Sequence, residues 1–169
     1  MLPQLEFEVE LWPRQRQALE SPATEILFGG ASSGGKSHLI REALIVWCLQ
    51  IPGLQCAIFR KHYDDVIGNH MEGPTGFKAR LAQLVARGLV QVVQTEIRFL
   101  CNGSMISLRH CGDERDLEKE QGKDRHVLVV DEATQIQERY IRFLRGWVRM
   151  PKEMQAKIPK ELQGRFPRI

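Results

Sequence analysis

Cysteines and long apolar runs are both scarce in this sequence, and each shortage excludes a class of protein. The 169 residues include four cysteines, at positions 48, 56, 101 and 111, and no two of them form a Cys-x-x-Cys motif. We therefore expect free thiols in a reducing compartment rather than a disulfide framework or a zinc cluster. No apolar run approaches the roughly 18 residues of a membrane span, and the start of the sequence does not resemble a signal peptide.

The composition is typical of one soluble globular domain. Hydrophobic residues make up 43% of the chain and charged residues 27%, and the formal net charge is +3. A chain of this length can bury a hydrophobic core of ordinary size. The mildly basic balance is compatible with a nucleic-acid partner but does not by itself indicate one.

Short apolar segments alternate with helical patterns along the chain. Strands are expected at residues 24–28, 56–59 and 127–130, and helices at 37–50 and 135–150. Wholly apolar strands alternating with helices are typical of a mostly parallel α/β sheet that is covered by helices on both faces.

The remaining segments are assigned from turn residues and spacing. Asn102-Gly103 separates two strand-like segments, which predicts a β-hairpin. An amphipathic helix is expected to begin at Phe77 and to end at Gly88. Residues 62–76 are rich in His, Asp, Asn, Gly and Pro, and we expect an exposed loop there; the segment after Pro151 is expected to be a polar tail.

A phosphate-binding loop is predicted directly after the first strand. The GxxxxGK[ST] pattern comprises Gly30, Ala31, Ser32, Ser33, Gly34, Gly35, Lys36 and Ser37. Glycines allow backbone N–H groups to face a phosphate at the start of a helix, the lysine reaches the β- and γ-phosphate oxygens, and the serine hydroxyl binds magnesium. The strand before the loop and the helix after it make an accidental Gly/Ser turn the weaker explanation.

A second motif follows the strand at 127–130. Four apolar residues lead into Asp131 and Glu132, the pattern of a Walker B strand. Asp131 is expected to hold the magnesium shell, and Glu132 to polarise the attacking water. The alternative is a strand that ends in two solvated acids, and the phosphate loop makes it the weaker one.

Trp12 and Gln15 precede the phosphate loop by about 15 to 18 residues. An indole can stack on adenine, and an amide can recognise its donor and acceptor edge. The alternative is that Trp12 covers the core and Gln15 is solvated. For the adenine contact itself, Gln17 is a second candidate beside Gln15.

Basic residues provide a further candidate surface. Arg139, Arg142, Arg145 and Arg149 recur on one side of the last predicted helix, opposite an apolar side. The stripe is either a solvated face or a contact for DNA phosphates or a neighbouring subunit. Arg60-Lys61, at a strand end, is placed to lie near a nucleotide or DNA. A metal-ligand role is not favoured for the scattered histidines.

Four segments together resemble the ATPase domain of the large terminase subunit of tailed phages: FGGASSGGKS, VVDEATQ, the hairpin stretch that begins at Arg98 and ends at Gly122, and the closing GRFPRI. The resemblance implies a P-loop ATPase of the additional-strand, catalytic-glutamate type. It implies a motor that uses ATP and Mg2+ to translocate double-stranded DNA into a procapsid as a ring of subunits. The implied partners are the terminase small subunit and the portal, the implied location is the cytoplasm of a bacterial host, and no membrane is involved.

The same resemblance assigns roles and exposes departures. It assigns Lys36 and Ser37 to phosphate and magnesium binding and Asp131 to magnesium binding. It assigns Glu132 to activation of the attacking water and Gln15 to the adenine contact. Some terminases carry an Arg-Gly pair that supplies an arginine finger, but Gln121-Gly122 stands here, so we consider Arg115, Arg125 and the arginine stripe instead.

Other departures concern the end of the sequence. It stops before the family's coupling motif, and the family's C-terminal nuclease domain is absent, so residues 1–169 are expected to be an ATPase domain that is either a fragment or a truncated gene product. The resemblance also implies that the strand after Walker B, beginning near Pro167, lies between strands 25–28 and 127–130. The alternatives are a helicase-like ATPase and a nucleotide-binding assembly module without turnover.

Overall fold

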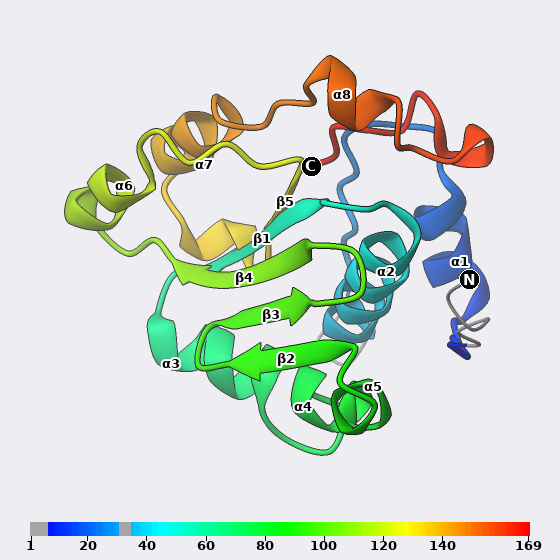
Figure 1. Cartoon of the computed structure of the whole chain (residues 1–169). Coiled ribbons are helices and arrows are strands. Elements are labelled where there is room, and N and C mark those ends of the chain that lie inside the picture. Colours follow the sequence, from blue (N-terminus) through cyan, green and yellow to red (C-terminus); the bar gives the residue numbers. More distant parts are fainter. Residues whose placement is uncertain (1–6, 31–34) are drawn as a thin grey trace.

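A single five-stranded sheet forms the centre of the protein (Figure 1). The computed structural model describes residues 7–30 and 35–169. The strand order is β2-β3-β4-β1-β5, and the strands are β1 (Gln55–Arg60), β2 (Val90–Val93), β3 (Glu96–Phe99), β4 (Ser104–His110) and β5 (Val127–Val130). β1 is parallel to β4 and β5, whereas β2/β3 and β3/β4 are antiparallel. The α/β class is confirmed, but the sheet is mixed, so the prediction of a mostly parallel sheet is wrong.

The predicted hairpin explains the mixed character of the sheet. β3 and β4 flank Asn102-Gly103, and Gly103 adopts a φ of 78°, which favours glycine. The hairpin is part of the same sheet, and its strand β3 runs opposite to the other four strands.

Helices lie against both faces of the sheet. They are α1 (Pro13–Glu20), α2 (Lys36–Gln50), α3 (Tyr63–Val66), α4 (Phe77–Arg80), α5 (Ala82–Ala86), α6 (Glu114–Glu120), α7 (Glu138–Arg145) and α8 (Lys152–Gln155), with a π-helix η1 (Ile67–Met71) and 3-10 turns η2 (Ala133–Gln135) and η3 (Lys160–Leu162). Among the described residues, no helix is long and apolar enough to cross a bilayer.

The alternation of side chains along β1 divides the core into two layers. Cys56 and Ile58 belong to the cluster that contains the buried face of α2. Ala57 and Phe59 belong to the cluster formed by α6, η2 and α7. Because successive strand residues point to opposite faces, the four consecutive apolar residues 56–59 in β1 are what a strand covered on both sides requires.

Three predicted segments differ from the structure. Residues 62–76 are not an exposed loop: α3 and η1 form there, and His70 and Met71 are buried. The last predicted helix is shorter, because η2 and α7 replace a continuous helix over 135–150. The expected polar tail contributes four buried apolar side chains to the core, Met154, Ile158, Leu162 and Phe166.

The strand predicted at residues 24–28 is not formed: the segment has no assigned strand, and Thr24 and Glu25 lie in a bend. It pairs instead with the last residue: Ile169 N–H donates to the Thr24 carbonyl at 2.8 Å, and Ile26 N–H donates to the Ile169 carbonyl at 3.0 Å. No strand partner other than this short contact is assigned to it among the described residues. This explains why the sheet ends at β5.

The neighbouring residue Arg168 pairs with β5 on the other side. Leu128 N–H donates to the Arg168 carbonyl at 2.9 Å, and Arg168 N–H donates to the His126 carbonyl at 3.0 Å. The closing dipeptide therefore lies between the segment before the phosphate loop and the β5 strand, in parallel orientation to β5. This is the placement expected for the residues after Pro167.

Candidate nucleotide site

A cavity of about 430 Å³ lies between residues 26–30, helix α2 and strand β5. Most of its lining is apolar, from α2 and the two backbone segments. Its titratable lining side chains, in the described part of the chain, are Lys36, Asp131, Glu132 and Arg168. The volume is within the range of small-molecule sites. Two motifs that are almost 100 residues apart in the sequence thus border one space.

The glycines on either side of the undescribed residues 31–34 both have positive φ. Gly35 precedes α2 and has a φ of 69°, and Gly30 has a φ of 148°. Lys36 Nζ donates a hydrogen bond to the Gly30 carbonyl at 3.1 Å, so the lysine side chain folds back across the loop. Ser37 is half-buried in the first turn of α2. Ala31, Ser32, Ser33 and Gly34 lie outside the described residues.

Gln15 is buried against this loop and is not solvated. Its Nε2 donates to the Gly35 carbonyl at 2.9 Å, and its Oε1 accepts from the Trp12 N–H at 2.8 Å. The amide therefore ties α1 to the start of α2 in this structure. Trp12 is 63% exposed, so it does not cover the core. The adenine contacts predicted for these two residues stay predictions.

Strand β5 delivers Asp131 to the carboxyl end of the sheet, where the residue is buried. Its Oδ2 accepts from Arg60 Nε at 2.8 Å and is 2.9 Å from His70 Nε2, while Oδ1 accepts from the Glu132 N–H at 3.1 Å. Burial alone would raise the pKa of Asp131, but the hydrogen bonds from His70 and Arg60 lower it to about 2. The carboxyl group is therefore ionised at neutral pH.

Glu132 occupies a strained backbone position at the same strand end. Its φ of 55° makes it the one non-glycine residue with positive φ among the described residues. Such conformations cost on the order of 1–3 kcal/mol and cluster at functional sites. The side chain is 41% exposed, and its Oε1 lies 3.7 Å from Arg60 Nη2. A carboxylate at the cavity rim that remains accessible to water suits a water-activating role.

Arg60, His70 and Arg41 are the site-adjacent residues whose contacts the motifs did not predict. The sequence placed Arg60 near a nucleotide or DNA, and its partners are the two Walker B acids. His70 belongs to no sequence motif, and it lies in the segment 62–76, for which the sequence predicts an exposed loop. Arg41 is buried on α2 and bonds to the Asn69 carbonyl, which only a fold containing η1 reveals.

The oxygen ligands expected for magnesium are compatible with that ion. Ser37 supplies a hydroxyl and Asp131 a carboxylate, both hard donors of the kind that Mg2+ prefers. No group of three or more His, Cys, Asp or Glu side chains that could hold a metal occurs among the described residues. That finding is expected for a magnesium ion that takes most of its ligands from phosphates and water.

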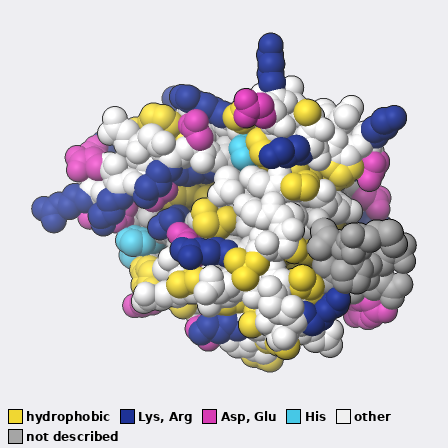
Figure 2. All heavy atoms as spheres, in the orientation of Figure 1, with side chains coloured by type: hydrophobic (Ala, Val, Ile, Leu, Met, Phe, Trp, Pro, Cys, Tyr) yellow, Lys and Arg dark blue, Asp and Glu magenta, His cyan; other side chains and the backbone are white. Residues whose placement is uncertain are grey.

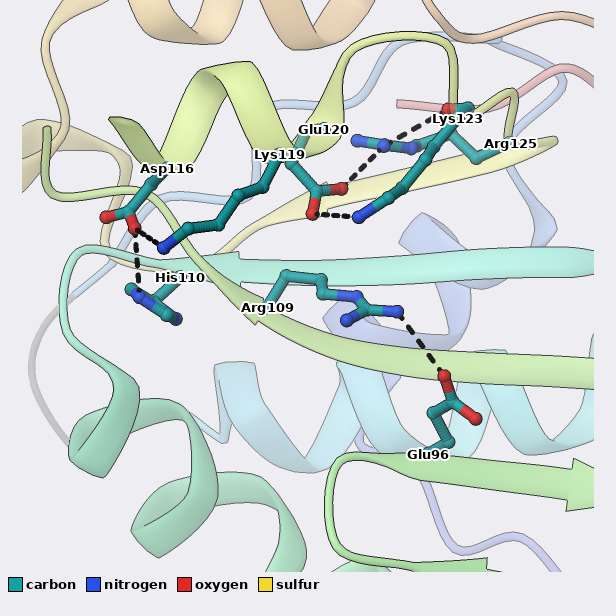
Figure 3. Close-up of polar contacts among 8 residues, drawn as sticks. All are labelled: Glu96, Arg109, His110, Asp116, Lys119, Glu120, Lys123 and Arg125. Carbon is teal, nitrogen blue, oxygen red and sulfur yellow. Dashed lines mark hydrogen bonds and ion pairs between the residues drawn. The ribbon is translucent and has the colours of Figure 1, made fainter. Parts of the chain in front are cut away.

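Arg125, a candidate arginine finger, is not available for a neighbouring subunit (Figure 3). It is buried, it donates to Glu120 Oε2 at 2.9 Å, and its guanidinium lies over the Phe59 ring. Figure 3 shows the charged groups around it paired with one another, including Lys123 with Glu120. Arg115, by contrast, is exposed on α6.

The arginine stripe is solvent-accessible but paired with acids. Arg142 contacts Glu138 at 2.6 Å, and Arg145 contacts Glu25. Arg139 contacts Glu114 at 3.1 Å, and Arg149 contacts Asp124 at 3.5 Å. On the face drawn in Figure 2, basic and acidic side chains stand beside one another rather than forming a field of one sign. A DNA-binding role for the stripe stays a prediction.

A scan against protein-family models found no matching family, and a search of curated proteins found no match. The fold defines the chain as an α/β protein with a mixed sheet. Because one fold hosts many functions, the function rests on the residues of the site.

Proposed function

We propose that this protein binds ATP with Mg2+ and hydrolyses it. The observation that carries the proposal is the shared lining of one cavity by Lys36, Asp131 and Glu132. Gly35 stands at the start of the 15-residue helix α2, with a left-handed backbone that turns the loop into the helix. A helix N-terminus and a lysine favour phosphate, and two acids on the facing strand provide metal and water chemistry.

Each residue then has one role. Lys36 neutralises β- and γ-phosphate oxygens, and it would exchange the Gly30 carbonyl for them when nucleotide binds. Ser37 and Asp131 would hold Mg2+, which supplies charge neutralisation at the phosphates. Glu132 orients or deprotonates the attacking water. Gln15 fixes Gly35 through its carbonyl and so sets the entry of the loop into α2.

We further propose that the hydrolysis powers translocation of double-stranded viral DNA, as in the terminase large subunits that the sequence resembles. The support is the resemblance of the four quoted segments. A ring of subunits, the terminase small subunit, the portal and procapsid, and the host cytoplasm belong to the same proposal. Exposed Arg115 is the candidate finger best placed to reach a neighbouring subunit.

An assembly module that binds nucleotide without turnover is the second candidate. It is favoured by one observation, the occupation of Asp131 Oδ2 by both Arg60 and His70. A carboxylate held by two donors is less available to a metal ion. The motor proposal requires these contacts to be compatible with bound Mg2+.

Hydrolysis assays with and without double-stranded DNA test the proposal. We expect magnesium-dependent ATP hydrolysis that Glu132→Gln reduces by roughly 10²–10⁴-fold, the range for losing a general base. ATP binding should be retained in that variant. Binding without any hydrolysis in the wild-type protein, with and without DNA, would support the assembly module instead.

A further inference from the structure

Three elements that are separate in the sequence meet at the carboxyl group of Asp131. Arg60 comes from the end of β1 and His70 from the π-helix η1, and both contact the same oxygen, Oδ2. π-helical turns are rare and are frequent at functional sites. Asp131 lines the cavity, but His70 and Arg60 do not, so they approach the carboxylate from behind.

The contact between His70 and Asp131 has a defined direction. An ionised carboxylate only accepts hydrogen bonds, so the Nε2 of His70 carries the proton and donates it. The ring is fully buried, and its Nδ1 has no hydrogen-bond partner among the described residues. Within the described ranges, the hydrogen bond of this side chain is therefore the one to Asp131. A buried ring with one open nitrogen is a costly way to fill a core, which favours a role at the carboxylate.

The π-helix is itself fixed to the helix that begins at the phosphate loop. Arg41 on α2 donates through Nη1 to the Asn69 carbonyl at 2.8 Å and through Nη2 to the Thr75 hydroxyl at 3.3 Å. Arg41 is buried, whereas Asn69 and Thr75 are exposed, so these bonds are partly buried. The position of the His70 ring is thus set by the same helix that carries Lys36, on the other side of the proposed site.

We propose that His70 is a positioning residue that holds the Asp131 carboxylate in the orientation in which it receives Mg2+. The proposal rests on the proposed nucleotide function. With Oδ2 held by His70 and Arg60, Oδ1 accepts only the backbone N–H of Glu132 among the described residues. Oδ1 then keeps a lone pair for a metal ion or for its water. Some residues hydrogen-bond to a metal ligand and fix its orientation. Removing such a residue typically weakens metal affinity 10- to 100-fold.

The magnesium-dependent part of nucleotide affinity tests this role. Affinity for a fluorescent ATP analogue is measured with Mg2+ and with EDTA, for wild type, His70→Phe and His70→Gln. We expect His70→Phe to weaken binding about 10- to 100-fold with Mg2+ and to leave it unchanged in EDTA. His70→Gln keeps an N–H donor and should remain within about threefold of wild type. His62→Phe, a change at an exposed histidine on the same segment, is the matched control.

A second measurement uses the unmodified protein, because His70→Phe can also impair folding. In ¹⁵N-histidine-labelled wild-type protein, the Nε2 resonance of His70 should move when Mg2+ and ATP are added together, and stay in place with ATP and EDTA. A resonance that does not move, or a His70→Phe protein whose magnesium-dependent affinity equals that of wild type, overturns the role of His70. A wild-type protein that binds ATP equally with Mg2+ and EDTA refutes the proposed magnesium site, and this role with it.

Discussion

The Nε2 of Gln15 lies 2.9 Å from the carbonyl oxygen of Gly35. Helix α1 is thereby hydrogen-bonded to the glycine that directly precedes α2. The same approach limits what residue 35 can be. A Cβ placed on Gly35 would lie 2.3 Å from that Nε2, and the φ of 69° is left-handed. The left-handed backbone favours glycine at this position, and a Cβ there would force the Gln15 amide to move.

Gly35→Ala should therefore destabilise the protein and weaken ATP binding. We expect a loss of about 1–2 kcal/mol in the free energy of unfolding from the left-handed backbone, since the Gln15 amide can move aside. Urea denaturation measures it. Gly68→Ala is the matched control, because nothing lies within 4 Å of a Cβ there and its φ is not left-handed. Equal losses in the two variants would contradict the account of Gly35.

Stability should fall as the pH is lowered from 7 to 5. Burial lowers the pKa of both His70 and His126 in the folded protein. The unfolded chain then binds more protons than the folded one below about pH 6.5, and each fully shifted histidine removes up to about 1.4 kcal/mol per pH unit. Urea denaturation between pH 5 and 8 tests this slope. His126→Gln should reduce it, and an unchanged slope would show that His126 is not buried in its neutral form.

The hydrogen bonds of the last residue make a further prediction. Ile169→Pro removes the N–H that donates to Thr24, whereas Ile169→Ala keeps it and removes only apolar contact. We expect the proline variant to unfold about 0.5–1.5 kcal/mol more easily than the alanine variant, because a backbone hydrogen bond to the exposed residue Thr24 is lost. Chemical denaturation of the two proteins compares them. The same stability in both would mean that residues 24–26 and 169 are not paired in solution.

The parts of the fold that the sequence predicted are those with strong local signals. α2 begins after Gly35 and ends at Gln50, as the apolar run and the following Pro52 indicate. β1 and β5 are short apolar runs, and the Asn102-Gly103 turn lies between β3 and β4. In each case one segment carries enough information, through burial or turn chemistry, to define its own conformation.

The parts that failed depend on distant contacts. Residues 62–76 looked like a loop because polar residues and glycines dominate them, yet His70 is buried by its bond to Asp131, 61 positions away. Four spaced apolar residues after Pro151 looked like a polar tail, and they become core only because the tail folds back over α2. The antiparallel part of the sheet is the predicted hairpin and its neighbour β2, but the local turn signal does not show that β4 pairs in parallel with β1 and so joins the hairpin to the central sheet.

Isothermal titration of ATP with Mg2+ into the wild-type protein and Lys36→Ala tests the central claim most directly. Lys36 Nζ donates a hydrogen bond to the Gly30 carbonyl. Among the described residues, Lys36 is the one lysine that lines the cavity. The account predicts tight binding to the wild-type protein, loss of it in Lys36→Ala, and retention in Lys61→Ala, which removes a lysine that does not line the cavity. Equal affinity of the wild-type and Lys36→Ala proteins would contradict the phosphate-loop assignment and the function built on it.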